Sequence, residues 1–152
     1  MSTSLFQRIR SWFTGAKSTG EAAPGEAERS THFVYLKIPE PLMPLDRGSK
    51  YEDPIDAALE PRRLGSVSGG GSQLGDERPD GTRPIEFCGI DIDVTDLEEA
   101  RSVLRAILVE LGAPAGTEIH FSIADEKLQD ELRVEGWLLQ QPRTFLHPGF
   151  GI

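Results

Sequence analysis

PIEFCGIDIDVTDLEEARSVLRAILVELGAPAGT, the stretch from Pro84 to Thr117, predicts a strand that leads directly into an amphipathic helix. Between positions 90 and 94 apolar and acidic side chains alternate, the pattern of a strand with one buried face. The apolar spacing then changes to three and four residues, as on one side of a helix, through Leu97, Ala100, Val103, Leu104, Ile107, Leu108 and Leu111. Gly112 suits the left-handed position that ends such a helix, and Pro114 prevents its continuation. We therefore expect this helix to pack against a sheet, with Asp91 and Asp93 on the sheet's other face.

Two local details accompany this stretch. Thr95 and Glu98 have the spacing of a capping box at the start of the helix. In the strand, Phe87 and Ile90 fall on alternate faces, and a bulge at Cys88-Gly89 would return both to the same face.

The flanking sequence predicts further elements. Residues 32–38 (HFVYLKI) form a strand with Tyr35 on its outer face, Asp53-Pro54 starts a short helix over 53–60, and residues 118–123 form a last strand. Residues 125–134 favour a short helix, because Leu128 and Leu132 are one helical turn apart. The stretch 65–72 (GSVSGGGS) suits a strand or a loop.

Together these elements predict an α+β fold, a ferredoxin-like βαββαβ sandwich. We expect an antiparallel sheet, one long helix and a C-terminal tail packed on the domain. The single domain would span residues 32–152, after a basic amphipathic segment at 1–14 and a flexible linker at 15–31.

Composition narrows the class of protein. Cys88 is the single cysteine, which excludes an intramolecular disulfide and a multi-cysteine zinc site. The N-terminus lacks the continuous apolar segment of a secretory signal. We therefore expect a cytoplasmic protein, peripheral to a membrane if its N-terminal segment binds lipid.

The net charge of −9 is unevenly distributed. Residues 1–20 carry +3, so the remainder carries −12. An acidic body repels the phosphate backbone of nucleic acids and attracts basic surfaces. The charge therefore favours a basic protein partner and disfavours nucleic acid.

Residues 4–13 (SLFQRIRSWF) predict a short helix that binds weakly to a membrane surface. Its apolar and basic residues are Leu5, Phe6, Arg8, Ile9, Arg10, Trp12 and Phe13. Docking in a partner's groove, or folding back onto the domain, are the alternatives.

The sequence contains only weak motifs for phosphate binding, metal binding or catalysis. Gly69-Gly70-Gly71-Ser72 is followed by acidic residues and not by the lysine of a phosphate-binding loop. Asp91, Asp93 and Asp96 lack the pattern of a calcium loop. Cys88 could form a nucleophile pair only with a distant histidine, His32, His120 or His147. We expect no metal or cofactor and lean against an enzyme.

Aromatic residues on the sheet's outer face, Phe33 and Tyr35, could stack nucleobases, but the motif of the RNA-binding sheets is missing. We expect the C-terminal tail to cover this face with Trp137, Leu138, Leu139 and Phe145.

The sequence hypothesis is a non-catalytic binding or regulatory protein whose acidic domain engages a basic partner, as an inhibitor or a toxin-neutralising (immunity-like) module does. The predicted contacts are Tyr35, Gly69, Gly70, Gly71, Ser72, Asp91 and Asp93. A membrane-tethered adaptor using residues 4–13, and a small ligand-binding protein or enzyme with a pocket near Gly69–Ser72, are the alternatives. The oligomeric state stays open.

Overall fold

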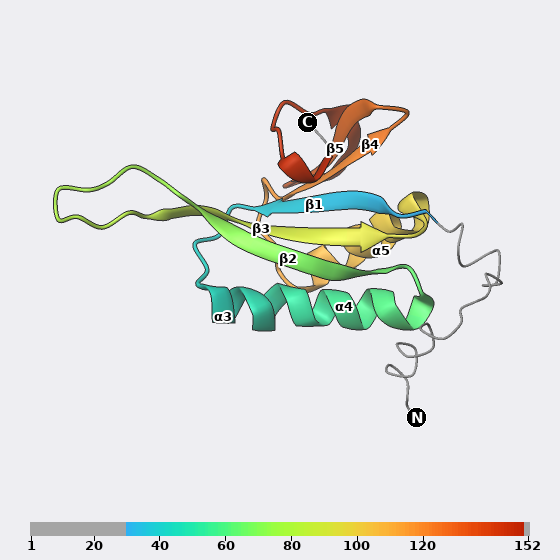
Figure 1. Cartoon of the computed structure of the whole chain (residues 1–152), viewed down its shortest axis with the longest axis horizontal. Coiled ribbons are helices and arrows are strands. Elements are labelled where there is room, and N and C mark those ends of the chain that lie inside the picture. The colour runs from blue at the N-terminus through green and yellow to red at the C-terminus, as the bar shows by residue number, and fades with distance from the viewer. Residues whose placement is uncertain (1–29, 151–152) are drawn as a thin grey trace, which may run out of the picture. The chain divides into compact units, whose positions relative to one another are not determined.

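The computed structural model describes residues 30–150. The predicted lipid-binding residues 4–13 lie outside the described residues, so their role stays a prediction. The described chain has an α+β fold, in which one antiparallel sheet of six strands is accompanied by helices (Figure 1).

The strands lie in the order β2-β3-β1-β4-β5-β6, and every neighbouring pair is antiparallel. Their bounds are β1 His32–Ile38, β2 Gly65–Leu74, β3 Ile85–Val94, β4 Glu118–Ile123, β5 Glu126–Arg133 and β6 Gly136–Pro142. The ambiguous Gly-rich stretch is therefore a strand, β2, and it forms one edge of the sheet. The connection from β2 to β3 projects beyond the rest of the domain in Figure 1.

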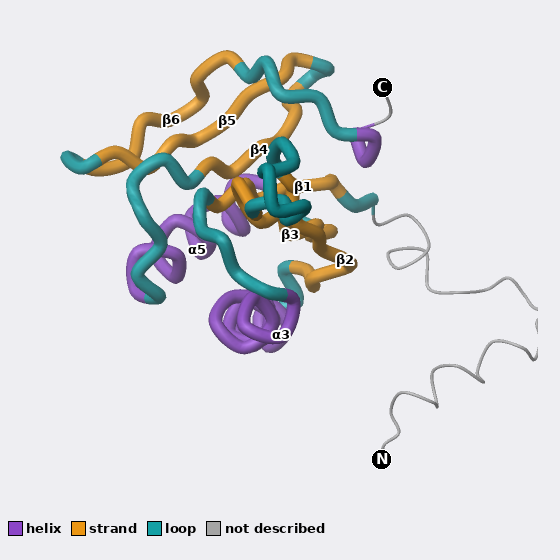
Figure 2. Tube along the Cα trace, turned by 90° about the vertical axis from the view of Figure 1, so that its left-hand side faces the viewer, coloured by secondary structure: helices purple, strands orange, loops and turns teal. Residues whose placement is uncertain are grey.

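Two helical runs lie on one side of the sheet (Figure 2). The first is continuous from Pro44 to Arg62, through α3 Pro44–Arg47, a π turn Gly48–Glu52, α4 Asp53–Leu59 and a 3₁₀ turn Glu60–Arg62. The second is α5 Leu97–Glu110. The expected short helix at 53–60 is thus only part of a longer run, and the fold has two such runs where we expected one long helix. The π turn ends two residues before Pro54, whose missing N–H would interrupt the α-helical hydrogen bonds.

The core lies between these helices and the inner face of the sheet. Ala100, Leu104 and Leu108 of α5 are fully buried, as are Leu36 of β1 and Ile92 of β3. The other members of the predicted apolar side of α5 are partly buried against this core. The predicted packing of the helix against the sheet is therefore confirmed.

The start of α5 differs from the predicted capping box. Asp96 is the N-cap, and its Oδ1 accepts a hydrogen bond from the Glu99 N–H at 3.0 Å. Thr95 Oγ1 instead donates to the Arg63 carbonyl at 2.8 Å. Gly112 has a φ of +81°, in the left-handed region as expected.

The predicted bulge at Cys88-Gly89 is wrong. The pairing of β1 with β3 is unbroken from His32↔Val94 to Ile38↔Cys88. The register shifts lie in the β2–β3 pairing, between Val67 and Gly69 and between Gln73 and Leu74. Cys88 is therefore buried on the inner face.

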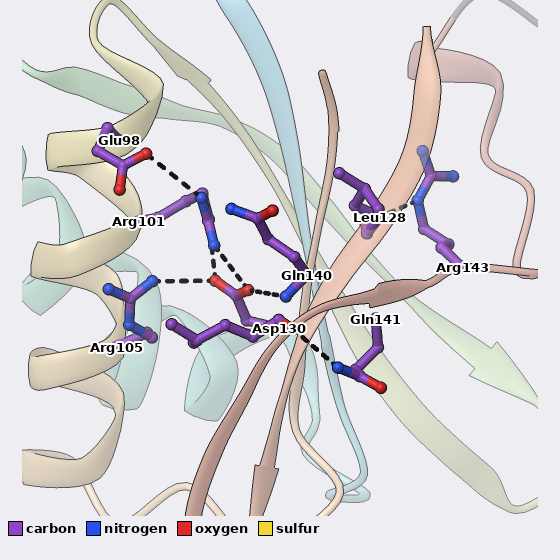
Figure 3. A network of polar contacts seen from close by, with 9 residues as sticks. Glu98, Arg101, Arg105, Leu128, Asp130, Gln140, Gln141 and Arg143 are labelled. Atoms are coloured by element: carbon purple, nitrogen blue, oxygen red, sulfur yellow. Dashed lines mark hydrogen bonds and ion pairs between the residues drawn. The ribbon is translucent and has the colours of Figure 1, made fainter. Parts of the chain in front are cut away.

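The expected helix at 125–134 is also wrong, because residues 126–133 form strand β5. Its inner face consists of Leu128, Asp130 and Leu132, all buried. Asp130 accepts hydrogen bonds from Arg101 Nε at 2.9 Å, Arg101 Nη2 at 2.8 Å and Arg105 Nη1 at 3.0 Å (Figure 3). The ion pair ties α5 to β5, and β5 pairs with β6 in place of a draped tail.

Candidate functional site

The candidate site lies on the outer face of the sheet, around Tyr35 of β1. The Tyr35 ring is stacked on the Phe145 ring, with centroids 5.7 Å apart and planes 7° apart. The His147 imidazole lies on it as well, at a centroid distance of 4.4 Å. Phe87 of β3 meets Phe145 edge-on at 5.8 Å. Residues 143–150 thus cover part of this face, on the side opposite the helices.

Arg143 fixes that segment to the sheet. Its guanidinium is buried and donates to the carbonyl groups of Phe121, Leu128 and Phe145 and to Ser122 Oγ, at 3.0 to 3.1 Å. Figure 3 shows its contact with Leu128. These four hydrogen bonds from one side chain join the covering segment to β4 and β5.

Two glycines form a bare backbone floor beside the aromatic residues. Gly71 of β2 is paired with Gly89 of β3. A Cβ at Gly89 would overlap the Tyr35 hydroxyl, so the glycine lets the tyrosine lie across the strand. A Cβ at Gly71 would meet no atom within 4 Å, so the space above Gly71 is open.

This open space is a hollow of about 350 Å³. Its walls and floor include aromatic, glycine and acidic residues, among them Tyr35, Gly71, Phe87, Asp91, Phe145 and His147. Five of the seven predicted contact residues line it, namely Tyr35, Gly70, Gly71, Ser72 and Asp91. Gly69 and Asp93 do not line it.

The remaining two predicted residues lie next to the hollow on the same strands. Gly69 is paired with Asp91, and a Cβ there would lie 3.2 Å from Asp91 Oδ2. Asp93 is paired with Phe33 of β1, one outward position further along β3. Gly70 and Ser72 contact the helical layer on the inner side, where Arg47 Nη1 donates to Ser72 Oγ at 3.4 Å.

Asp91 is the carboxylate of the hollow. Its side chain is 31% exposed, and Oδ1 lies 3.4 Å from His147 Nε2. Burial, and then the negative charge of Asp91, raise the pKa of the Tyr35 hydroxyl to about 12. Tyr35 therefore stays protonated at physiological pH and can donate a hydrogen bond.

His120 of β4 lies beneath the covering segment and is fully buried. Its Nε2 is 2.8 Å from Glu118 Oε1, and its ring is 5.5 Å from that of Phe145. Burial lowers the pKa of His120, although the Glu118 hydrogen bond opposes this. The imidazole is therefore neutral at pH 7.

The neighbouring β2 edge is open to another strand. No described strand pairs with its outer side, where the Val67 N–H donates to Asp56 Oδ1 at 2.7 Å. The ten residues GSVSGGGSQL contain neither a charge nor a proline. Charged residues and prolines help to prevent edge strands from pairing with other chains, as do covering helices and bulges. Beyond Val67 this edge has no charge or proline, while Asp56 of α4 occupies the Val67 N–H and the pairing with β3 contains two register shifts.

The described domain is strongly acidic. Positions 30–150 hold 22 acidic and 12 basic residues, a net charge of −10. Ion pairs within the domain leave this net charge unchanged, because each joins a basic side chain to an acidic one; the basic members are Arg47, Lys50, Arg101, Arg105 and Arg133. The charge left for a partner is therefore negative.

The structure separates Cys88 from His120 and His147, two of the histidines that could form a nucleophile pair with it. Cys88 Sγ is buried on the inner face and donates to the Glu40 carbonyl at 3.1 Å. His120 and His147 lie on the outer face. Within residues 30–150 no three His, Cys, Asp or Glu side chains are grouped to hold a metal ion.

Sequence reasoning identified the floor of the hollow and only part of its wall. The sequence predicts Phe145 as a covering residue, but it offers His147 only as a possible partner of Cys88. Trp137 packs against the core, while Leu138 and Leu139 are exposed. Residues 145 and 147 both carry rings and are two positions apart. This spacing is the sequence signal that could have placed both rings on one face.

Comparison of the chain with protein-family models, curated proteins and solved structures gave no match. In the part of the chain that the structure describes, every helix is too short or too polar to cross a bilayer. The geometry of the outer face is therefore the basis for a functional proposal.

Proposed function

We propose that this protein is a non-catalytic binding protein whose acidic domain engages a basic protein partner through the outer face at β2 and β3. The observation that carries this proposal is the hollow, which brings the largely buried Tyr35, Asp91 and the strand Gly70–Ser72 together on the outer face. An inhibitory or neutralising role fits a module that acts by occupying a partner's basic surface.

The β2 edge supplies a way to hold such a partner. An extended segment that adds to a sheet edge gains a row of main-chain hydrogen bonds, while side-chain pockets beside the edge give specificity. Ser72 and Gln73 of β2 line the hollow. A segment paired with β2 would therefore present its side chains at the mouth of the hollow.

Electrostatics supports a basic partner. A net charge of −10 over the described residues attracts positive surfaces over about one Debye length, roughly 8 Å at physiological salt. Association should therefore be fast at low salt and slower as salt is added.

The finer fold assignment belongs to the same proposal. The element order strand, helix, strand, strand, helix, strand and the order β2-β3-β1-β4 support a ferredoxin-like core, to which β5 and β6 are added beyond β4. The fold itself does not indicate the function.

Site-specific photo-cross-linking tests the proposal. A photo-reactive phenylalanine analogue would replace exposed Gln73 beside the hollow, and in a second variant Val109, which is 55% exposed on α5. In extract of the protein's own cells we expect the position-73 variant to cross-link a protein of basic isoelectric point. The yield should fall as salt is raised, and the position-109 variant should give little of the same product.

Equal yields from the two positions, or an acidic protein as the product, would contradict the proposal. If the cross-linking yield did not change with salt, electrostatic attraction would no longer be part of the proposal.

A further inference from the structure

We propose that the hollow on the outer face receives one arginine side chain of the partner, with its guanidinium against the aromatic rings and paired with Asp91. This inference rests on the proposed function and names the group that the site recognises. It is argued from the shape of the hollow, its rings and its carboxylate.

The size of the hollow fits a side chain. Its volume of about 350 Å³ is near the lower end of ligand pockets, which span roughly 300–1,000 Å³. The floor at Gly71 has no Cβ to fill it, and Gly71 is exposed at the β2 edge. A side chain projecting from a segment along that edge can therefore enter.

The walls have the chemistry that a flat cation requires. Phe87, Phe145 and His147 line the hollow, together with the largely buried Tyr35. Aromatic faces attract cations through the ring quadrupole, and a planar guanidinium also stacks on them. Asp91 contributes the opposite charge at the same place.

The molecule uses the same pairing twice within its own fold. The Arg101 guanidinium carbon lies 4.0 Å from the centre of the Phe121 ring, and that of Arg143 lies 4.1 Å from the centre of the Phe150 ring. Arg101 contacts both the Phe121 ring and a carboxylate, that of Asp130. The hollow offers the same combination of ring and carboxylate with no guanidinium of the described chain among its lining residues.

Arginine is favoured over lysine by two features. A carboxylate accepts two parallel hydrogen bonds from a guanidinium, whereas an ammonium acts as a point charge. The Phe87–Phe145 pair already has an ammonium close to it, since Lys37 Nζ lies 4.5 Å and 5.8 Å from the two ring centres. Lys37 repels either cation, but a guanidinium is more weakly hydrated than an ammonium and therefore loses less hydration on entering a hollow lined by rings.

The test uses the ¹⁵N-labelled full chain and a defined probe, the peptide acetyl-Gly-Arg-Gly-amide. The control peptide has citrulline in place of arginine, which keeps the shape and removes the charge. We expect the arginine peptide to shift the amide signals of Gly71 and Gly89, and the citrulline peptide to bind at least about fivefold more weakly, the scale of one partly exposed charged contact.

Variants locate the binding. Asp91→Asn should weaken the arginine peptide at least about fivefold, while the matched control Asp93→Asn, on the same strand and face but outside the hollow, should change its affinity less than about twofold. Gly71→Val should abolish the Gly89 shift by filling the floor, where an added Cβ meets no atom within 4 Å. An unchanged urea unfolding midpoint would show that the variant keeps the fold.

Equal binding of the two peptides, shifts that map to another face, or equal effects of the two aspartate variants would overturn the proposal. If position 73 still cross-links a basic partner while the arginine peptide fails, the arginine site is wrong and the binding function stands. If the peptide binds in the hollow but position 73 cross-links nothing, the function is wrong and the arginine site stands.

Discussion

At the scale of single residues, Tyr35 and Gly89 determine the shape of the outer face. The tyrosine ring lies across the glycine, and Phe145 and His147 then pack on the ring. The absence of one side chain at position 89 therefore positions the aromatic wall of the hollow.

The glycines at 71 and 89 make a matched pair for mutation. Gly89→Ala would force Tyr35 to move, and we expect a loss of about 1–3 kcal/mol in the free energy of unfolding, as for other overpacked sites. Gly71→Ala, at the paired position, adds a Cβ that meets no atom within 4 Å. The free energy of unfolding should therefore change by less than about 1 kcal/mol. Urea unfolding of both variants measures this; equal losses would show that Tyr35 does not lie over Gly89.

His120 gives the fold a dependence on pH. Its pKa is lowered in the folded state by burial, so below about pH 6.5 the unfolded chain binds a proton that the folded chain does not. Stability should therefore fall as pH drops from about 6.5, by up to about 1.4 kcal/mol per pH unit. The lowered pKa of Glu118, where the His120 hydrogen bond and nearby charges outweigh burial, adds a loss of the same sign only below about pH 4.5.

His120→Gln keeps a hydrogen-bond donor for Glu118 and removes the titration. Between about pH 7 and pH 5 the unfolding free energy of this variant should change less with pH than that of the wild type. Urea unfolding at several pH values, followed by tryptophan fluorescence, measures both slopes. Parallel slopes would assign the pH dependence to another group.

At the scale of elements, the ion pair between α5 and β5 is the main polar contact across the core. Asp130 is fully buried, and it accepts hydrogen bonds from two arginines and from the Gln140 N–H at 2.9 Å (Figure 3). It thus holds β5, and with it β6, against the helix.

Removing the charge of Asp130 should be costly. Asp130→Asn leaves the Arg101 guanidinium, 1% exposed, with only the exposed carboxylate of Glu98, 3.6 Å away, as a counter-charge, and we expect a loss of about 3–5 kcal/mol in unfolding free energy. Arg105→Gln removes the more exposed partner and should cost about 1 kcal/mol. Chemical denaturation measures the unfolding free energy of both variants. Similar losses would mean that burial does not determine how much the ion pair between Asp130 and Arg101 contributes to stability.

The same pair explains why β5 was predicted as a helix. An aspartate at position 130 interrupts the apolar alternation of Leu128 and Leu132, and those two leucines also have helical spacing. The partner that makes Asp130 an inner-face residue, Arg101, lies 29 positions away and is not evident from local sequence. By contrast, β1, β3 and α5 have patterns that are complete within each segment, so they could be predicted, as could the outward direction of Tyr35 and Asp91.

At the scale of the whole molecule, charge is distributed unequally along the chain. Residues 1–20 carry +3, whereas positions 30–150 carry −10. An anionic surface would attract the first and repel the second.

Liposome flotation tests the predicted role of residues 4–13. We expect the intact chain to float partly with anionic vesicles, less with neutral ones and less at high salt, because its apolar side chains bind together with Arg8 and Arg10. A chain that lacks residues 1–20 should remain in the lower fraction. If both chains float equally, the membrane-tethered alternative is removed.

The path of residues 143–150 has a practical consequence for anyone who handles this protein. Pro148 lines the hollow, so a fluorescent label attached to this segment lies at the surface that is to be assayed. A bulky group there would obstruct binding and give a false negative result. Labels for interaction measurements are better inserted in the exposed β2–β3 connection near Gly81.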